Sequence, residues 1–336
     1  MVTVGIIGVG YWGPNLVRVV SQSQQSTLKW CSDLNDDNLK KISKLYPSIK
    51  CTKDYHDMLA DKEVDAIIIS TPAFTHYKIA MDCLSNNKNV LIEKPMTYNS
   101  KECEDLIKVS KDKDKVLMVG HTFEYDPCIN KLKEYVNDGL LGDIYYLYST
   151  RVNLGVIRDD VNSMWNLAPH DVSILLYLLN KKPISVSARG HSYLKENNED
   201  VVFIIVEFEG NIFAQIHVSW LDPTKVRRLT IVGNKKMVVF DDMDNEAKIK
   251  IYDKGVTKLS SKDGYGEYLF KLRAGDIHIP KIELSEPLKN EFLHFEDCII
   301  NHKVPRSDGE KGMQVVKILE AAQKSLDNRG EIISLI

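Results

Sequence analysis

The sequence predicts an α/β plus α+β protein of two domains, the first built on a parallel sheet and the second on a large, mainly antiparallel sheet. Three observations predict this. Short apolar runs alternate with helical patterns as far as residue 120, a glycine-rich turn directly follows the first run, and later strand patterns follow one another through tight turns. A chain of 336 residues is long enough for two domains, which we place at 1–121 and 122–336.

The first 120 residues show the alternation expected of a parallel sheet. Val64–Ser70 is the clearest strand, because it is apolar, β-branched and without polar alternation, as in strands covered on both faces. Alternating strands and helices imply right-handed crossovers between parallel strands. The predicted strands are Val2–Ile7, Leu28–Ser32, Val64–Ser70, Asn89–Ile92 and Val116–Gly120, and the predicted helices are Tyr11–Ser23, Asp36–Tyr46, Thr75–Ser85 and Ser100–Asp112.

The remaining residues are dominated by strand patterns. Gly210–Asn211 joins two of them and is typical of a hairpin turn, so we expect a mainly antiparallel sheet. Lys254–Pro287 has little periodicity and is predicted to be irregular. The predicted strands are Ile144–Asn153, Ile184–His191, Val201–Glu209, Ile212–Trp220, Arg227–Val232, Lys236–Phe240 and Lys248–Tyr252, and the predicted helices are Pro127–Asn137, His170–Leu179, Leu288–Ile300 and Gly312–Ser325.

The composition argues against several classes of protein. The chain has 44 Lys+Arg against 47 Asp+Glu and a net charge of −3, which gives no basic footprint for nucleic acid or an anionic membrane. No apolar run approaches the ~18 residues of a membrane span, and the N-terminal sequence MVTVGIIGVG is typical of a strand rather than a signal peptide. The six cysteines form no C-x-x-C pair, so we expect reduced thiols, a cytoplasmic location and no metal site.

The turn after the first predicted strand carries a G-x-G-x-x-G motif, Gly8-Val9-Gly10-Tyr11-Trp12-Gly13. In a strand–turn–helix context Gly8 permits the tight turn, Gly10 lets the backbone approach a pyrophosphate, and Gly13 lets helix and strand pack closely. The N–H groups that begin the helix then face the phosphates. Glycines also serve ordinary turns, but this context predicts a dinucleotide-binding Rossmann domain that includes Tyr11 and Trp12 in its cofactor loop.

Asp33 indicates which dinucleotide the domain prefers. It stands 20 residues beyond Gly13, at the end of the second predicted strand. There a carboxylate can accept hydrogen bonds from the adenosine ribose hydroxyls and would repel a 2′-phosphate. No Arg or Lys follows among residues 34–37. The sequence therefore predicts NAD as cofactor in preference to NADP.

Three further strand ends carry polar or catalytic residue types. In an open parallel sheet the carboxyl ends of the strands form the ligand-binding edge, so these residues should converge on one crevice. A lysine and two histidines there suit proton and electrostatic chemistry, although each also has an ordinary reading as a solvated cation or a structural histidine. The residues are Thr71 and Pro72 with His76, Glu93 and Lys94 before Pro95, and His121 after Gly120.

Together these motifs resemble the glucose–fructose oxidoreductase / inositol dehydrogenase (Gfo/Idh/MocA) family. The matching pieces are GVGYWG, the Asp of CSDLN, STPAFTH, IEKP, VGHTFEYDP and WNLAPHDVSI, in family order along roughly the whole chain, including the closing ILEAAQKSL helix. The resemblance implies a lysine that binds substrate and assists proton transfer, matching Lys94. It also implies a general acid/base histidine within D-x-x-x-H, matching His170.

The chain departs from that family pattern four residues before the histidine, where Asn166 replaces the aspartate. Residues four apart on a helix share a face, so Asn166 and His170 can still meet one substrate. An amide can orient a hydroxyl but cannot supply a negative charge. Members acting on nucleotide-linked amino sugars are similar in carrying Asn there, which points to that substrate class. Glu124 stands where many members have Arg, and we assign it no role.

The chemistry expected is oxidation of a secondary alcohol. NAD⁺ accepts the hydride, while the protein must take the proton and position the carbon. A histidine suits the proton, so we predict His170 as general base with Lys94 as electrostatic anchor; the alternative for His170 is a helix-start histidine after Pro169. Other predicted contacts are Thr71, Pro72, His76 and Glu93 on the nicotinamide side, and His121, Asn153 and Trp165 toward substrate, beside structural alternatives for each.

The function predicted is an NAD-dependent dehydrogenase acting on a sugar hydroxyl, most simply the 3-hydroxyl of a UDP-N-acetylglucosamine-type nucleotide sugar. The alternatives are a free polyol or monosaccharide dehydrogenase of the inositol type and a non-catalytic NAD-binding sensor. Lys225, Arg227 and Arg228 are phosphate or subunit contacts in one interpretation and a solvated strand edge in the favoured one. The expected partners are a small sugar or nucleotide sugar and further copies of the chain, as a homodimer or homotetramer.

Overall fold

A computed structural model describes residues 1–155, 157–258 and 270–336. The chain divides into two compact units, Met1–Asp126 with Ser285–Glu320, and Pro127–Leu284 with Ala321–Ile336. These units differ from the contiguous division at 121/122, because Ser285–Glu320 belongs with the first unit. Its helix α8 (Pro287–Ile300) packs against α1 (Gly13–Ser21) and the first strand, which the sequence pattern did not indicate.

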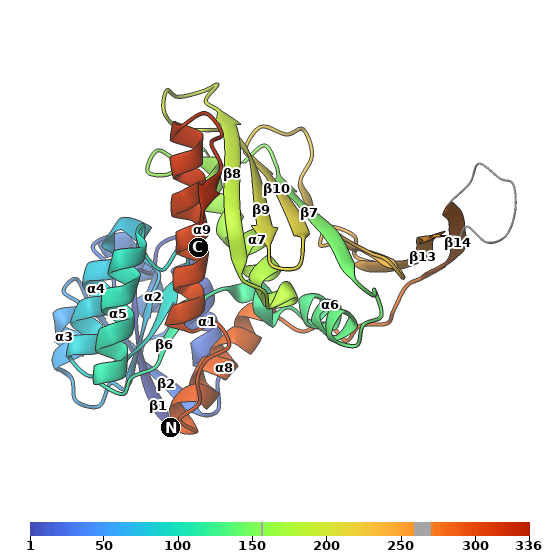
Figure 1. Ribbon diagram of the computed structural model, residues 1–336. Coiled ribbons are helices and arrows are strands. Elements are labelled where there is room, and N and C mark those ends of the chain that lie inside the picture. Colours follow the sequence, from blue (N-terminus) through green and yellow to red (C-terminus); the bar gives the residue numbers. More distant parts are fainter. Residues whose placement is uncertain (156, 259–269) are drawn as a thin grey trace, which may run out of the picture. The chain divides into compact units, whose positions relative to one another are not determined.

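The first unit is a doubly wound parallel sheet with strand order β3-β2-β1-β4-β5-β6 (Figure 1). The order reverses between β1 and β4, and a parallel sheet binds ligands outside the carboxyl ends of its strands at such a switch point. The predicted parallel sheet is therefore confirmed. The strands are β1 (Val2–Ile7), β2 (Ser26–Ser32), β3 (Lys50–Thr52), β4 (Ala66–Ile69), β5 (Asn89–Glu93) and β6 (Leu117–Gly120).

Helices cover this sheet, with α4 packed against α5 and α1 against α8. Asparagine side chains begin two of them: Asn35 accepts from the Asp37 N–H and Asn99 from the Glu102 N–H. Strand β3 and helix α3 were missed because three and five residues are too short for a periodic pattern. The remaining helices are α2 (Asp36–Leu45), α3 (His56–Ala60), α4 (His76–Ser85) and α5 (Ser100–Asp112), with 3₁₀ turns η1 (Ala73–Thr75) and η2 (Thr122–Tyr125).

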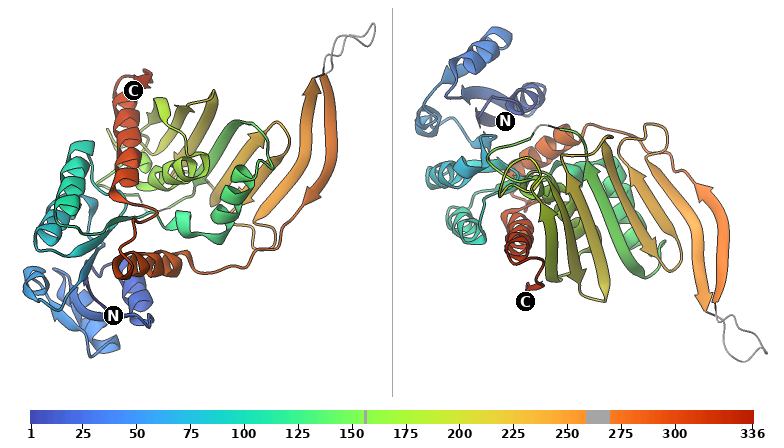
Figure 2. Two further views of the ribbon diagram at one scale, coloured as in Figure 1. Left: turned by 60° about the horizontal axis from the view of Figure 1, so that its bottom comes forward. Right: turned by 90° about the horizontal axis from the view of Figure 1, so that it is seen from above.

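The second unit is a nine-stranded sheet in the order β14-β13-β12-β11-β7-β10-β9-β8-β15 (Figure 2). Among the described strands of this second sheet only β7 and β10 pair in parallel, so the expected mainly antiparallel sheet is confirmed. Gly210 and Asn211 have φ of +86° and +59° and form the predicted hairpin turn. The strands are β7 (Ile144–Val152), β8 (Pro183–His191), β9 (Val201–Phe208), β10 (Ile212–Ser219), β11 (Val226–Gly233), β12 (Met237–Asp241), β13 (Ile249–Lys258), β14 (Phe270–His278) and β15 (Ile333–Ser334).

One face of this sheet is covered by helix α7 (Ser163–Leu179), which packs on β7, β9 and β10 and against α6 (Pro127–Asn137). Along β9 and β10 buried and less buried residues alternate, as in a sheet with one open face. On that open face the Phe203 and His217 rings stack at 4.2 Å. Its exposed or half-buried side chains are Tyr146, Tyr148, Phe203, Ile205, Phe213, Gln215 and His217.

Two sequence predictions in this unit were wrong. Helix α7 begins at Ser163 rather than at His170, because Asn162 caps it by accepting from the Trp165 N–H, and Pro169 lies inside the helix rather than at its start. Lys254–Pro287 is not wholly irregular: β13 extends to Lys258 and β14 pairs with it. Every residue of β14 is exposed, so burial imposes no alternation on its sequence. Residues 259–269 of that stretch lie outside the described part of the chain.

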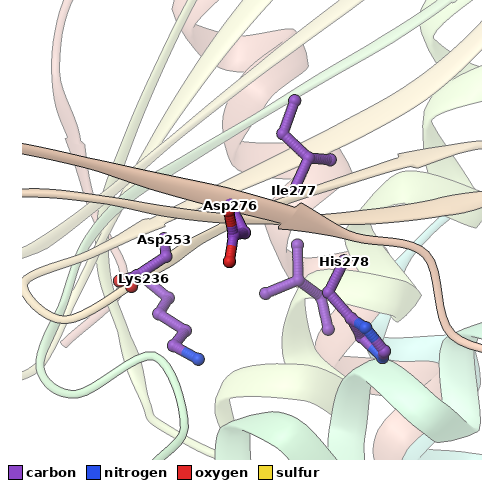
Figure 3. Close-up of a pocket in the computed structure, with 6 residues that line it drawn as sticks. Lys236, Asp253, Asp276, Ile277 and His278 are labelled. Atoms are coloured by element: carbon purple, nitrogen blue, oxygen red, sulfur yellow. The ribbon is translucent and has the colours of Figure 1, made fainter.

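Residues of β13 and β14, with Lys236 just before β12, border an open hollow of about 620 Å³ (Figure 3). Lys236, Asp253, Asp276 and His278 line it, but the Asp253 carboxylate accepts from Arg273 at 3.1 Å. None of the residues predicted for the site lines this hollow. The hollow is therefore not the ligand site that the sequence predicts.

A buried ion pair fixes helix α7 to the sheet. The Arg151 guanidinium on β7 donates to the Asp171 carboxylate at 2.6 Å, and the two side chains are 8% and 6% exposed. Asp171 directly follows His170, so this pair also sets the position of that histidine. Both charges are desolvated, and each depends on the other for compensation.

We expect Asp171→Asn to lower the free energy of unfolding of the second unit by about 3–5 kcal/mol, because Arg151 would keep a buried charge without its carboxylate. Urea unfolding measures this. The matched control is Asp160→Asn, which breaks an exposed pair with Arg158 of 2.7 Å and should cost at most ~1 kcal/mol. Equal effects of the two substitutions would contradict the assigned role of the buried pair.

Candidate active site

The glycine loop has the geometry that a dinucleotide requires. Gly8 has φ +89°, and a Cβ there would lie 2.8 Å from Ser70 backbone atoms. A Cβ on Gly13 would lie 2.3 Å from the Gly8 carbonyl oxygen, so close packing demands glycine at both positions. At Gly10 a Cβ would meet only Asn38, at 3.9 Å, so the backbone there is open to a phosphate. The loop thus fits the pyrophosphate of NAD.

The start of helix α1 supports the same reading. Trp12 occupies the N-cap position, and no side chain caps the helix through a hydrogen bond. The first N–H groups and the positive end of the helix dipole are therefore available to an anion. Tyr11 is 97% exposed beside them. That Tyr11 and Trp12 contact the cofactor stays a prediction.

Asp33 is held at the end of β2 by three donors. Its Oδ2 accepts from the Val9 N–H at 2.9 Å and the Asn38 side chain at 3.2 Å, and its Oδ1 accepts from the Asn35 N–H at 2.8 Å. The carboxylate is thus fixed against the glycine loop with lone pairs left to accept from ribose hydroxyls. The sequence does not single out Asn38 as a donor to Asp33, because an amide five residues after a carboxylate belongs to no motif.

The end of β4 is tied to the lysine segment through His76. Its ring is 1% exposed, Nδ1 lies 2.9 Å from the Pro95 carbonyl oxygen and Nε2 lies 2.9 Å from the Thr71 carbonyl oxygen. Burial lowers the pKa of His76, assisted by the Lys94 charge and opposed by the two carbonyl contacts. His76 therefore positions Thr71 and Lys94, while its direct contact with the cofactor stays a prediction.

Thr71 and Thr75 share a hydroxyl contact of 2.7 Å above the end of β4. Thr75 also donates to the Pro72 carbonyl, and its side chain does not cap α4. The Thr71–Pro72 turn is thereby rigid. It can offer a fixed surface to a ligand at this edge of the sheet.

Lys94 lies half-buried just beyond β5 and acts on the histidines at the neighbouring strand ends. His121, after β6, is 1% exposed, and no described residue hydrogen-bonds either of its ring nitrogens. Burial and the Lys94 charge lower the pKa of His121 to about 3. His121 is thus a neutral imidazole with hydrogen-bonding capacity that a bound ligand or water can use.

Carboxyl groups cluster in this unit, and sequence reasoning named Glu93 and Glu124 but missed Glu291. Glu93 accepts from the Trp12 indole N–H at 2.7 Å. Glu291 on α8 is 1% exposed and accepts from the Thr122 hydroxyl at 3.1 Å, and Glu124 is 3% exposed in η2. The signal for Glu291 was present: it lies between Leu288 and Phe295 on the apolar stripe of α8, where a charge is not expected.

The other predicted residues lie in the second unit, described here by itself. Asn166 and His170 both belong to α7, four residues apart, so the prediction that they share a helix face is consistent with the helix. Asn153 directly follows β7 and is half-buried. The Trp165 indole N–H donates to the Gln323 side chain at 3.2 Å, and Asn162 donates to the same oxygen at 3.0 Å. Gln323 thus fixes the orientation of Trp165.

The favoured interpretation of a strand edge was wrong for Arg227 and Arg228, because β11 lies between β12 and β7 and pairs with both. Arg227 pairs with Asp242 at 3.3 Å and Arg228 with Asp241 at 2.7 Å across β11 and β12. Lys225 is exposed beside them. Within the described residues there is also no group of three or more His, Cys, Asp and Glu able to hold a metal ion, and no helix long and apolar enough to cross a membrane.

Comparisons with known proteins agree with this architecture. Residues 2–121 match the family model "Oxidoreductase family, NAD-binding Rossmann fold" (GFO_IDH_MocA), and residues 129–239 match the "GFO/IDH/MocA C-terminal domain". Together these cover well over half of the chain. The chain belongs to the Gfo/Idh/MocA family. It is accordingly an oxidoreductase with an NAD-binding Rossmann domain, and NAD is its cofactor.

Relatives span nearly the whole chain at low identity. Myo-inositol 2-dehydrogenase of Thermotoga maritima is 23% identical over 98% of this chain and 97% of that protein. UDP-N-acetylglucosamine 3-dehydrogenase of Acidithiobacillus ferrooxidans is 25% identical over 93% of each. The solved structure of the latter enzyme, GnnA, aligns with a TM-score of 0.80 and 23% identity over 97% of this chain and 98% of that one. The structure of GenD2 from gentamicin A biosynthesis, in complex with NAD, aligns with a TM-score of 0.83 and 20% identity. The alignment covers 100% of this chain and 96% of that one.

We expect Asp33→Ala to weaken NAD⁺ binding by roughly ten- to a hundredfold, the size of a charge-assisted hydrogen bond, while the wild type binds NAD(H) more tightly than NADP(H). Isothermal titration of both cofactors measures this. The control is Asp36→Ala, an exposed carboxylate three residues on that pairs with Lys53 at 2.7 Å. If the wild type bound NADP(H) as tightly as NAD(H), Asp33 would not be the residue that selects NAD(H).

Proposed function

We propose that this protein oxidises a secondary hydroxyl of a sugar, with the 3-hydroxyl of a UDP-N-acetylglucosamine-type nucleotide sugar as the best candidate. The observation that supports it most is a half-buried lysine at the carboxyl edge of the parallel sheet, beside two buried histidines, together with Asn166 and His170 on one helix. Bound NAD⁺ supplies the hydride acceptor for this reaction.

Lys94 is the electrostatic anchor in this proposal. Its charge lowers the pKa of both His76 and His121, so it faces groups kept neutral around it. An ammonium in such a desolvated place stabilises negative charge that develops on a substrate oxygen. His121, whose ring nitrogens have no hydrogen bond to a described residue, completes this side by orienting a neighbouring hydroxyl.

His170 takes the hydroxyl proton, for which an imidazole is suited near neutral pH. The Arg151–Asp171 pair holds the turn of α7 that carries it. Asn166 binds a substrate oxygen one turn earlier, Trp165 offers a face fixed by Gln323, and Asn153 contributes from the end of β7. Lys94 and His170 belong to different units, and their joint action on one substrate is what the proposal asserts.

The choice of a nucleotide sugar rests on Asn166 and on the UDP-N-acetylglucosamine 3-dehydrogenase relative. An amide at this position can donate to a carbonyl or hydroxyl oxygen of an amino sugar without adding charge. The inositol dehydrogenase relative keeps a free polyol as the second candidate. A purely sensory NAD-binding role is less favoured, because both Lys94 and His170 are present.

We also propose a homodimer or homotetramer working in the cytoplasm. The open face of the large sheet carries Tyr146, Tyr148, Phe203 and Phe213, each about two-fifths or more exposed. An apolar patch of this kind on a sheet favours self-association. Sedimentation equilibrium of the purified protein tests the assembly.

A screen of NAD⁺ reduction against nucleotide sugars and free polyols tests the function directly. The proposal expects turnover of a UDP-amino sugar or its uronate. Turnover of free inositol with refusal of every nucleotide sugar would select the inositol-type alternative. Binding of NAD without turnover of any sugar would favour the sensor.

We expect Lys94→Ala to reduce turnover to near background while NAD⁺ affinity stays within a few-fold, because the ammonium acts mainly on charge that develops in the transition state. Steady-state kinetics and titration of NAD⁺ separate the two effects. Lys101→Ala, an exposed lysine on α5, serves as control and should keep wild-type rates. A Lys94→Ala variant that retains most of the wild-type rate would show that Lys94 has no catalytic role.

We expect His170→Ala to slow the chemical step by ~10²–10⁴-fold, as for loss of a general base. Asn166→Asp should slow it less and should raise the pKa seen in the pH profile of kcat, because a carboxylate one turn away favours the charged imidazole. Single-turnover kinetics across pH measure both. An unchanged chemical step in His170→Ala would show that a group other than His170 is the general base.

A further inference from the structure

Glu93 lies next to Lys94 but has no part in the proposed proton transfer. Its Oε1 accepts from the Trp12 indole N–H at 2.7 Å. A Cβ built on Gly120 would lie 3.2 Å from Glu93 Oε2, so the carboxyl group rests directly on the end of β6. The Glu93 carboxyl is therefore held in one orientation, between the glycine loop and β6.

Glu291 brings a second carboxyl group to the same place. Its Oε2 accepts from Thr122, two residues beyond Gly120, at 3.1 Å. Its side chain is 1% exposed, and no described residue hydrogen-bonds its Oε1. Glu93 and Glu291 thus both contact the short segment 120–122, from β5 and from α8. Two carboxyl groups that repel each other at such a place cannot both ionise easily.

The surrounding charges decide which carboxyl group keeps the proton. Burial raises the pKa of Glu93, while the Lys94 charge and the Trp12 donor lower it. Burial, followed by the Glu93 charge, raises the pKa of Glu291 well above its usual range; Thr122 opposes this and the Glu124 charge adds to it. The Lys94 ammonium and the Trp12 indole N–H, the donor of the shorter hydrogen bond, both favour ionisation of Glu93. Of the two carboxyl groups, Glu291 therefore keeps its proton.

The other titratable side chains near Glu93 and Glu291 are His76, His121 and Glu124, and their pKa values decide whether they titrate together with the pair. Burial together with the Lys94 charge lowers the pKa of His76 and takes that of His121 to about 3, so both rings are neutral at pH 7. Burial raises the pKa of Glu124 to about 8, against the charges of Lys311 and Arg306 and with that of Asp308. Among these three described side chains, Glu124 is therefore the one that can titrate near neutral pH, and the binding experiment needs a Glu124 variant as control.

We propose that the Glu93 carboxylate makes the site favour the oxidised cofactor, and that Trp12 and Glu291 are positioning residues that act through it, Trp12 by orienting the carboxylate and Glu291 by holding the proton of the pair. Asp33 takes the adenosine half at β2, so the nicotinamide half reaches the ends of β4, β5 and β6. The nicotinamide ring is a cation when oxidised and neutral when reduced, and only the cation gains from a nearby carboxylate.

The inference rests on the proposed placement of the nicotinamide and not on the identity of the sugar, so it is tested by binding alone. Titration calorimetry gives Kd for NAD⁺ and for NADH without substrate. At pH 7 we expect Glu93→Gln to lower the ratio Kd(NADH)/Kd(NAD⁺) by about tenfold or more, and Trp12→Phe to lower it by a smaller factor. Trp30→Phe is the matched control, because it removes an indole–carboxylate bond of 2.8 Å to Asp61 elsewhere in the unit.

The pH dependence identifies Glu291. In the wild type the ratio rises with pH in two steps, the first as Glu93 ionises and the second as Glu291 ionises. Glu291→Gln mimics the neutral acid, so it keeps the lower step and loses the upper one. Glu124→Gln keeps both steps. An unchanged ratio in Glu93→Gln, or an upper step that survives in Glu291→Gln and disappears in Glu124→Gln, would overturn the proposal. Absence of sugar turnover in the wild type would instead count only against the proposed function.

Discussion

The half-buried ammonium of Lys94 acts on three titratable side chains beside it, those of His76, His121 and Glu93. Its charge lowers the pKa of His76 and of His121, and it opposes the effect of burial on Glu93. His76 in turn contacts the carbonyl beside the lysine and the carbonyl that ends β4. A positive charge held between two buried imidazoles and a carboxyl group is a site that responds strongly to charge developing on a ligand, because buried side chains screen charge weakly.

The two units contribute different kinds of specificity. In the first, backbone geometry dominates: we propose that the glycine turn, the start of helix α1 and the fixed Asp33 carboxylate bind parts of the cofactor that every NAD molecule shares. In the second, side chains on α7 and at the end of β7 supply hydrogen-bonding groups, oriented by the Arg151–Asp171 pair and by Gln323. Substrate choice within the family is therefore expected to change through these side chains while the cofactor half stays constant.

Sequence reasoning placed the glycine turn and Asp33 at the strand ends where the structure has them, because Gly8, Gly13 and Asp33 have steric or electrostatic requirements tied to fixed spacings. It also located Lys94 and the strand ends beside it. It did not reach Glu291, which arrives from a helix some 170 residues after Thr122 in the chain. The apolar stripe of α8 marks Glu291 as a buried charge, but a local pattern does not reveal which distant residues it packs against. The start of α7 was misplaced for a related reason: Pro169 suggested a first turn, whereas the Asn162 cap and burial of Met164 extend the helix.

The central claim is that Lys94 and His170 act on one hydroxyl of one sugar. A crystal structure with NAD and a UDP-amino sugar tests it most directly. The account predicts a ring hydroxyl within hydrogen-bond distance, ~2.6–3.2 Å, of both the Lys94 ammonium and a His170 ring nitrogen, with Asn166 on a neighbouring oxygen. A sugar ring bound far from either residue would contradict it.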